Sequence, residues 1–127
     1  MKRCLISMLV VLALSMAVCL SSFLVMRHVA EEIEAMRMEI LDLAEAGDMD
    51  GAAERITQMA EMWERHEPLL EAISPHETLH AVIELIIEAD ANFTVRDMDD
   101  FNRSMRLLGM ALEHLYLEER LRLENIF

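Results

Sequence analysis

The chain has 127 residues, enough for one compact domain and too few for a large catalytic cleft between two lobes. With only three glycines and two prolines, its composition favours helices over strands or irregular loops and predicts an all-α protein. A net charge of −13 argues against nucleic acid as a ligand, so we expect any partner to be a basic protein, a cation or a neutral surface.

The first element is an uncharged run at residues 4–26, CLISMLVVLALSMAVCLSSFLVM. A helix over this range would be about 34 Å long, enough to cross a bilayer with some tilt. Lys2 and Arg3 precede it and mostly acidic residues follow, so the positive-inside rule places the N-terminus in the cytoplasm. We therefore predict a single-pass anchor in the cell membrane at residues 1–26 and an extracytoplasmic domain at residues 27–127.

A cleaved secretory signal is the alternative interpretation of this run, because signals also begin with basic residues followed by apolar ones. The run exceeds the roughly 7 to 15 apolar residues of a signal core. The nearest small-residue cleavage pattern, Ala17-Val18-Cys19, is also a poor match. An uncleaved anchor is the prediction that follows.

The outer domain has no cysteine, because Cys4 and Cys19 both lie in the apolar run. Its stability must come from packing rather than from disulfides or a zinc knuckle. It contains nine arginines, no lysine and all 24 acidic residues of the chain, hence a formal charge of −15. Such a surface repels nucleic acid and anionic lipid headgroups.

After the apolar run, the hydrophobic periodicity predicts that the first helix continues to Gly47. Asp48 or Asp50 is the expected N-cap of a second helix, which runs to about Ile73 with a bend at Pro68. The apolar stripe of the first helix consists of Val29, Ile33, Met36, Ile40 and Leu43.

Ser74 and Glu77 match a capping box with Pro75 at the first helical position, and this pattern predicts where the third helix begins. Thr94 and Asp97 predict a second capping box, for the fourth helix. The fourth helix has a regular apolar stripe at Met98, Phe101, Met105, Leu108, Leu112 and Leu115.

Short connections between these helices favour antiparallel neighbours. The fold class we predict is all-α, with an N-terminal transmembrane helix followed by an antiparallel up-down four-helix bundle. Gly109, beside the stripe of the fourth helix, is expected to permit the close approach of a neighbour.

Several residues besides the anchor form a pattern along the chain: Gly47, Asp48, Ala52, Ala53, Trp63, His76, Asn125, Ile126 and Phe127. Through these residues the chain resembles a family of small bacterial membrane-anchored proteins known as domain of unknown function 4363. The resemblance extends over nearly the whole chain, and it implies the architecture above and no activity. In the family an acid often precedes the first histidine of the third helix, where this chain has Pro75.

The sequence HETLH, from His76 to His80, has the His-Glu-x-x-His form of zinc peptidases. Its extended version requires glycine and histidine three and six positions after His80, where Ile83 and Ile86 stand. Glu77 already has a role in capping, and the outer domain has no predicted strand to hold a peptide. A zinc peptidase is therefore the least favoured interpretation.

A divalent-metal buffer or sensor is the main alternative function. The turn between the second and third helices brings His66 and Glu67 back toward His76 and His80, and imidazole with carboxylate suits zinc, nickel or copper. A histidine hydrogen-bonded near a turn is the simpler interpretation, and we expect no cofactor.

The function that the sequence favours is that of a non-catalytic interaction or structural module, bound to the membrane through residues 4–26 and to a protein partner. We do not expect an enzyme or a nucleic-acid binder. Trp63, Ile126 and Phe127 are candidate contact residues, although the position of Trp63 on an apolar stripe favours a core role. His76 and Asn125 complete the set of candidate residues through the family pattern.

Overall fold

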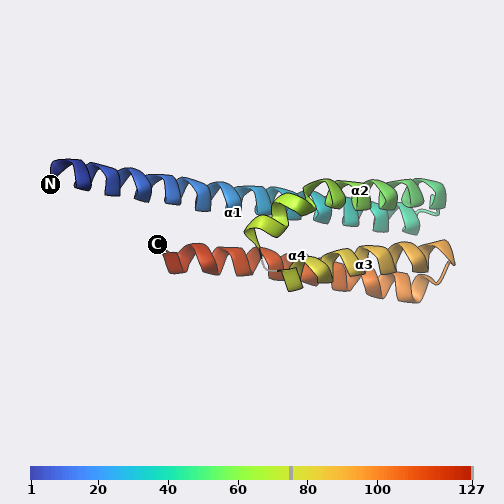
Figure 1. Cartoon of the computed structure of the whole chain (residues 1–127). Helices are drawn as coiled ribbons and strands as arrows, with labels where there is room; N and C mark the ends of the chain where they lie inside the picture. The colour runs from blue at the N-terminus through green and yellow to red at the C-terminus, as the bar shows by residue number, and fades with distance from the viewer. Residues whose placement is uncertain (75, 127) are drawn as a thin grey trace.

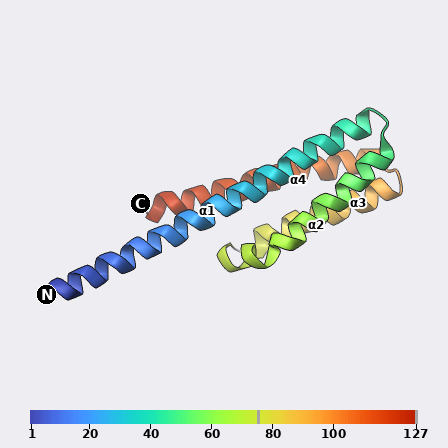
Figure 2. The same cartoon turned by 90° about the horizontal axis from the view of Figure 1, so that it is seen from above.

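The structure, a computed structural model, describes residues 1–74 and 76–126. Its four helices are α1 (Lys2–Glu45), α2 (Met49–Ile73), α3 (His76–Thr94) and α4 (Met98–Ile126). They lie side by side in alternating directions, and the N-terminal part of α1 extends alone beyond the other three (Figures 1 and 2). The predicted up-down four-helix bundle is confirmed, and the described residues contain no strand.

In cross-section the four helices form a square. The backbones of α1 and α3 both lie close to those of α2 and α4, whereas the backbones of the diagonal pairs do not approach one another closely among the described residues. The apolar stripes of all four helices therefore face one shared core, whose largest fully buried side chains include Trp63, Phe93 and Phe101. The predicted stripe of α4 is confirmed, since its residues from Phe101 to Leu115 are buried and Met98 is partly buried.

Two similar turns close one end of the bundle, which we call the distal end (residues 45–49 and 94–98). Each has a residue with positive φ, Gly47 at 84° and Arg96 at 59°. In each turn the next N–H reaches back over five residues at 2.9 Å, from Asp48 to the Leu43 carbonyl and from Asp97 to the Asn92 carbonyl. This is the backbone closure that a left-handed residue after a helix makes possible.

Both distal turns then start the next helix with an aspartate cap. The side chain of Asp48 accepts a hydrogen bond from the Gly51 N–H at 3.0 Å, and that of Asp97 accepts one from the Asp100 N–H at 3.2 Å. The capping box predicted between Thr94 and Asp97 is wrong. Thr94 is the last residue of α3, and its hydroxyl donates to the Asp90 carbonyl one turn earlier.

The opposite end, which we call the proximal end, comprises Ile73, Ser74 and residues 116–126 of α4. There α2 contains Pro68 and stays one helix, and its last turns bend away from the line of its first half (Figure 1). The capping box predicted between Ser74 and Glu77 does not form as expected. The Ser74 N–H donates to the Leu70 carbonyl, and its hydroxyl donates to Glu119 in α4. Pro75 lies outside the described residues.

Candidate functional site

The histidines of the predicted metal cluster do not form a site in the part of the chain that the structure describes. His66 is half-buried on α2, with its Nδ1 2.8 Å from the Met62 carbonyl oxygen, and Glu67 beside it is also half-buried. His80 is exposed on α3. No group of three or more histidine, cysteine or acidic side chains is placed to hold a metal ion among these residues. His76 begins α3, but its side chain lies outside the described residues.

The remainder of the HETLH motif is engaged in the fold or exposed to solvent. Glu77 is exposed in the first turn of α3. Ile86, six residues after His80, is fully buried, and Ile83 packs against the core. The positions that an extended zinc site would use for a glycine and a third histidine therefore hold core side chains.

Among the described residues that carry the family resemblance, most have a structural role in the core or in a turn. Trp63 is fully buried, and its indole N–H has no hydrogen-bond partner among the described atoms. Gly47 and Asp48 make a distal turn, and Ala52 is buried close behind it. Asn125 is exposed at the end of α4, while the side chain of Ile126 and all of Phe127 lie outside the described residues.

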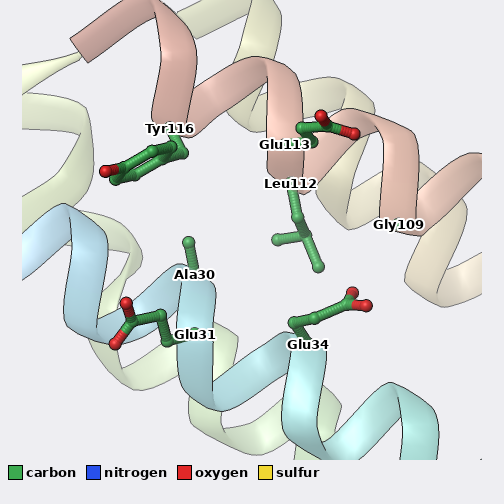
Figure 3. Close-up of a pocket in the computed structure, with 7 residues that line it drawn as sticks. All are labelled: Ala30, Glu31, Glu34, Gly109, Leu112, Glu113 and Tyr116. Atoms are coloured by element: carbon green, nitrogen blue, oxygen red, sulfur yellow. The ribbon is translucent and has the colours of Figure 1, made fainter. Parts of the chain in front are cut away.

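A groove of about 390 Å³ lies between α1 and α4. Figure 3 shows Ala30 of α1 and Leu112 of α4 pointing toward each other across it, with the ring of Tyr116 nearby. Gly109 forms part of its floor, and its acidic lining residues are Glu31, Glu34 and Glu113. The groove therefore combines apolar walls with a rim of carboxylates.

Two of these carboxylates already have partners within α1. The Arg27 guanidinium donates to Glu31 at 2.9 Å and Arg37 donates to Glu34 at 2.7 Å. The hydrogen bond to Glu34 raises the pKa of Arg37, and this exceeds the opposing effect of burial. Like any arginine, Arg37 is cationic at physiological pH, and the Glu34 carboxylate stabilises this charge. For Glu113 no hydrogen bond or ion pair within the described chain is present, which leaves its carboxylate to an incoming group.

Gly109 has a definite structural role at this groove. A Cβ at this position would lie 2.8 Å from the Arg37 Cζ, so the absence of a side chain makes room for the guanidinium. Arg37 also donates to the Met105 carbonyl of α4 at 3.3 Å. The close approach predicted at Gly109 is confirmed, although the neighbour is an arginine side chain rather than a helix backbone.

A buried polar cluster holds the proximal end together. Glu119 of α4, only 7 % exposed, accepts a hydrogen bond from the Ser74 hydroxyl at 2.7 Å and one from Arg122 at 3.3 Å. Arg122 also donates to the Ile73 carbonyl at 3.3 Å. Nearby, Thr78 of α3 donates to Glu118 at 2.8 Å. These contacts attach the start of α3 and the end of α2 to α4.

The outer face of α4 bears a second, mostly apolar stripe, which we call the outer stripe (Leu107, Met110, His114, Leu117 and Leu121), with His114 as its polar member. Its residues follow steps of three and four, and all of them are exposed. At 100° per residue the outer stripe lies about 160° around α4 from the core stripe. An apolar row of this regularity on the side opposite the core has no role in the packing of the bundle.

The spacing of three and four residues in the outer stripe could have been recognised from the sequence alone. It was missed because the core stripe of the same helix is more hydrophobic. The Glu119 cluster has no local signal, since its partners are 45 and 49 residues away along the chain.

The fold and these surfaces define a class of protein. It is an all-α bundle whose first helix begins with an exposed, apolar segment long enough to cross a membrane. The model of the family described as domain of unknown function 4363 matches residues 21–126, and the chain belongs to that family. No curated protein and no solved structure matched the chain.

Proposed function

We propose that this protein is a membrane-anchored, non-catalytic interaction module whose bundle stands outside the cell membrane and binds a partner protein through the distal half of the outer stripe. The observation that carries the proposal is the exposure of Leu107 and Met110 on α4, opposite the core. Steps of three and four residues fit the apolar face of a partner helix, as in other helix-to-helix contacts.

The anchor part of the proposal is supported by α1. None of the residues in the most apolar stretch of α1 is buried against the rest of the described chain. In a soluble protein, a helix this apolar would be buried in the core. Lys2 and Arg3 precede the apolar stretch and the acidic bundle follows it, which supports a cytoplasmic N-terminus and an outer bundle.

The net charge of the bundle favours a basic partner, whose acidic side chains would meet Arg103 and Arg106, one turn before Leu107 and Met110. The bundle beyond the apolar run has a formal charge of −15, and Glu113, next to His114 of the outer stripe, is free to receive a cation. A basic helix would be attracted over several ångströms and then fixed by the apolar contact with Leu107 and Met110.

Photocrosslinking in the native membrane tests this function. A photoreactive phenylalanine analogue replaces Met110 in one variant and Ile87 of α3 in the control, because both side chains are 61 % exposed. We expect one discrete adduct at Met110 and none at Ile87. Its partner segment, identified by mass spectrometry, should be rich in lysine or arginine, and the adduct should weaken at about 0.5 M salt as screening shortens the range of the charges.

Equal labelling at Met110 and Ile87 would contradict the proposal, as would an adduct at Met110 with an acidic partner. A Leu107→Ser variant provides the second readout. It should reduce the adduct formed at Met110 severalfold and leave the helical content unchanged, because Leu107 contributes little to the core.

A further inference from the structure

The C-terminal turns of α4 run beside the apolar half of α1. The rings of Phe23 and Tyr116 lie 6.0 Å apart between centroids. Farther along, Val18 and Cys19 of α1 line a cavity of about 160 Å³ together with Leu123 of α4. Figures 1 and 2 show the two helices side by side, with α4 ending part of the way along α1.

The register of this pair conflicts with a simple anchor at residues 4–26. The helices are antiparallel, so the ten steps from Tyr116 to Ile126 bring the end of α4 level with roughly Ala13 of α1. The part of α1 that stands alone is then about 17 Å long. The hydrocarbon core of a bilayer is about 30 Å thick. If residues 4–26 of α1 span the membrane and the two helices keep this register, the last turns of α4 lie within the outer leaflet, and their end is about 13 Å below the surface of the hydrocarbon core.

The surface of α4 at this level suits such a position. Leu117 and Leu121, one turn apart, are 43 % and 59 % exposed. Four of the nearby charges form two pairs, Arg120 with Glu124 at 3.2 Å and Arg122 with Glu119 at 3.3 Å. The fifth, Glu118, accepts a hydrogen bond from the Thr78 hydroxyl. Paired charges lose less on leaving water than single ones, and an arginine can extend its guanidinium toward phosphates while its stem stays among apolar groups.

We propose that residues 117–126 of α4 lie within the outer leaflet of the membrane that α1 crosses. Leu117 and Leu121 face acyl chains there, and the Arg120 and Arg122 guanidinium groups meet lipid phosphates. The inference rests on the membrane anchor of the proposed function. It assigns the proximal half of the outer stripe to lipid and leaves the distal half, Leu107 and Met110, to a protein.

A bilayer fits this segment better than a second copy of the chain. Two bundles with a formal charge of −15 each would repel one another along the whole of their outer faces. A neutral phospholipid surface imposes no such cost. Residues 117–126 pack along the apolar half of α1, so a membrane that contains this half of α1 also contains them. Contact with a second bundle does not follow from this packing.

Spin-label accessibility in vesicles tests the inference with the full chain. Cys4→Ser and Cys19→Ser give a cysteine-free background, and a nitroxide is attached to one of three new cysteines: Leu121→Cys, Leu9→Cys or Met110→Cys. The native side chains have similar exposure, at 59 %, 55 % and 61 %. The vesicles contain phosphatidylcholine, and relaxation is measured with oxygen, which concentrates in hydrocarbon, and with a water-soluble nickel chelate.

We expect the labels at Leu9 and Leu121 to collide severalfold more with oxygen than with nickel, and the label at Met110 to show the opposite ratio. A nickel-accessible label at Leu121 together with an oxygen-accessible label at Leu9 would overturn this inference and leave the anchor intact. Nickel access at Leu9 would overturn the anchor as well.

Spin–spin broadening at Leu121 would mean that a second copy covers the segment, and this too would overturn the inference. A nitroxide at Leu117→Cys repeats the test at a second position. The emission of the buried Trp63 reports whether each labelled chain has kept its core.

Discussion

The distal and proximal ends of the bundle are closed by different means. At the distal end, each turn is built from a left-handed residue and an aspartate cap within a few residues of each other. At the proximal end, Glu119 joins Ser74 across 45 residues of sequence. Local backbone geometry closes one end, while long-range side-chain contacts close the other, at the level where we place the membrane.

The largest effect should come from the core that both ends share. Replacing Trp63 with alanine should cost about 3 to 5 kcal/mol of stability, because it leaves a large cavity among buried side chains. Urea unfolding of the full chain in detergent, followed by circular dichroism, measures the loss. Trp63→Phe is the matched control, with a smaller loss because it also removes an unpartnered N–H. Unchanged stability in Trp63→Ala would mean that the tryptophan is not a core residue.

Removing the Glu119 carboxylate should weaken only the proximal end. Glu119→Ala leaves the Ser74 hydroxyl and the Arg122 guanidinium without their shared acceptor, at an expected cost of about 2 to 3 kcal/mol. Hydrogen exchange should accelerate around Ile73 and not at the distal turns. Glu124→Ala removes an exposed pair with Arg120 and should cost less than about 1 kcal/mol. Equal losses in the two variants would show that Glu119 has no special role.

Substituting Gly47 should weaken only the distal end. Its φ of 84° is strained for any residue with a side chain, so Gly47→Ala should cost about 1 to 2 kcal/mol. Faster hydrogen exchange is expected at the α1–α2 turn, with the proximal end unaffected. Glu45→Ala, at an exposed position two residues earlier, should change stability by less than about 0.5 kcal/mol. Faster hydrogen exchange at both ends of the bundle would contradict the idea that the two ends are stabilised independently.

The smallest effect concerns Arg96, the other left-handed residue. Its guanidinium lies 4.5 Å from the Phe93 ring centroid and donates to the Phe93 carbonyl at 3.0 Å. Arg96→Ala loses these contacts and keeps the strain, so about 0.5 to 1 kcal/mol should be lost. Arg96→Gly relieves the strain and should be close to neutral. Thermal unfolding of the two variants separates the loss of the contacts with Phe93 from the backbone strain. An alanine variant as stable as the glycine variant would contradict this account.

The distal end was largely predictable from the sequence, and the proximal end was not. Gly47 and Asp48 have strong local preferences for a helix end and a cap. Gly47 was assigned correctly, and Asp48 was one of the two N-cap candidates, with Asp50. Thr94 was misassigned because Arg96, an unusual residue for positive φ, ends α3 later than the capping pattern suggested. The Ser74 N–H completes the last turn of α2 by donating to the Leu70 carbonyl, whereas its hydroxyl donates to Glu119 through tertiary packing, which local patterns do not report.

The two candidate surfaces, the outer stripe and the groove between α1 and α4, also differ in how far the sequence predicts them. The outer stripe of α4 repeats at helical spacing and was readable from the sequence alone. The groove beside Gly109 depends on the register of α1 against α4, which periodicity leaves undefined. The apolar run at residues 4–26 was recognised by its composition, but the length of α4 beside it became visible only in the structure.

The central claim is that α1 anchors the chain and presents the distal end outside the cell. Its most direct test is labelling of intact cells with a membrane-impermeant maleimide, using Asp50→Cys in the Cys4→Ser, Cys19→Ser background, because Asp50 is exposed in the first turn of α2, next to the distal turn. The account predicts that this cysteine is labelled before permeabilisation and that the protein stays with the membranes through alkaline extraction. Labelling that requires permeabilisation, or release of the protein into the soluble fraction, would contradict it.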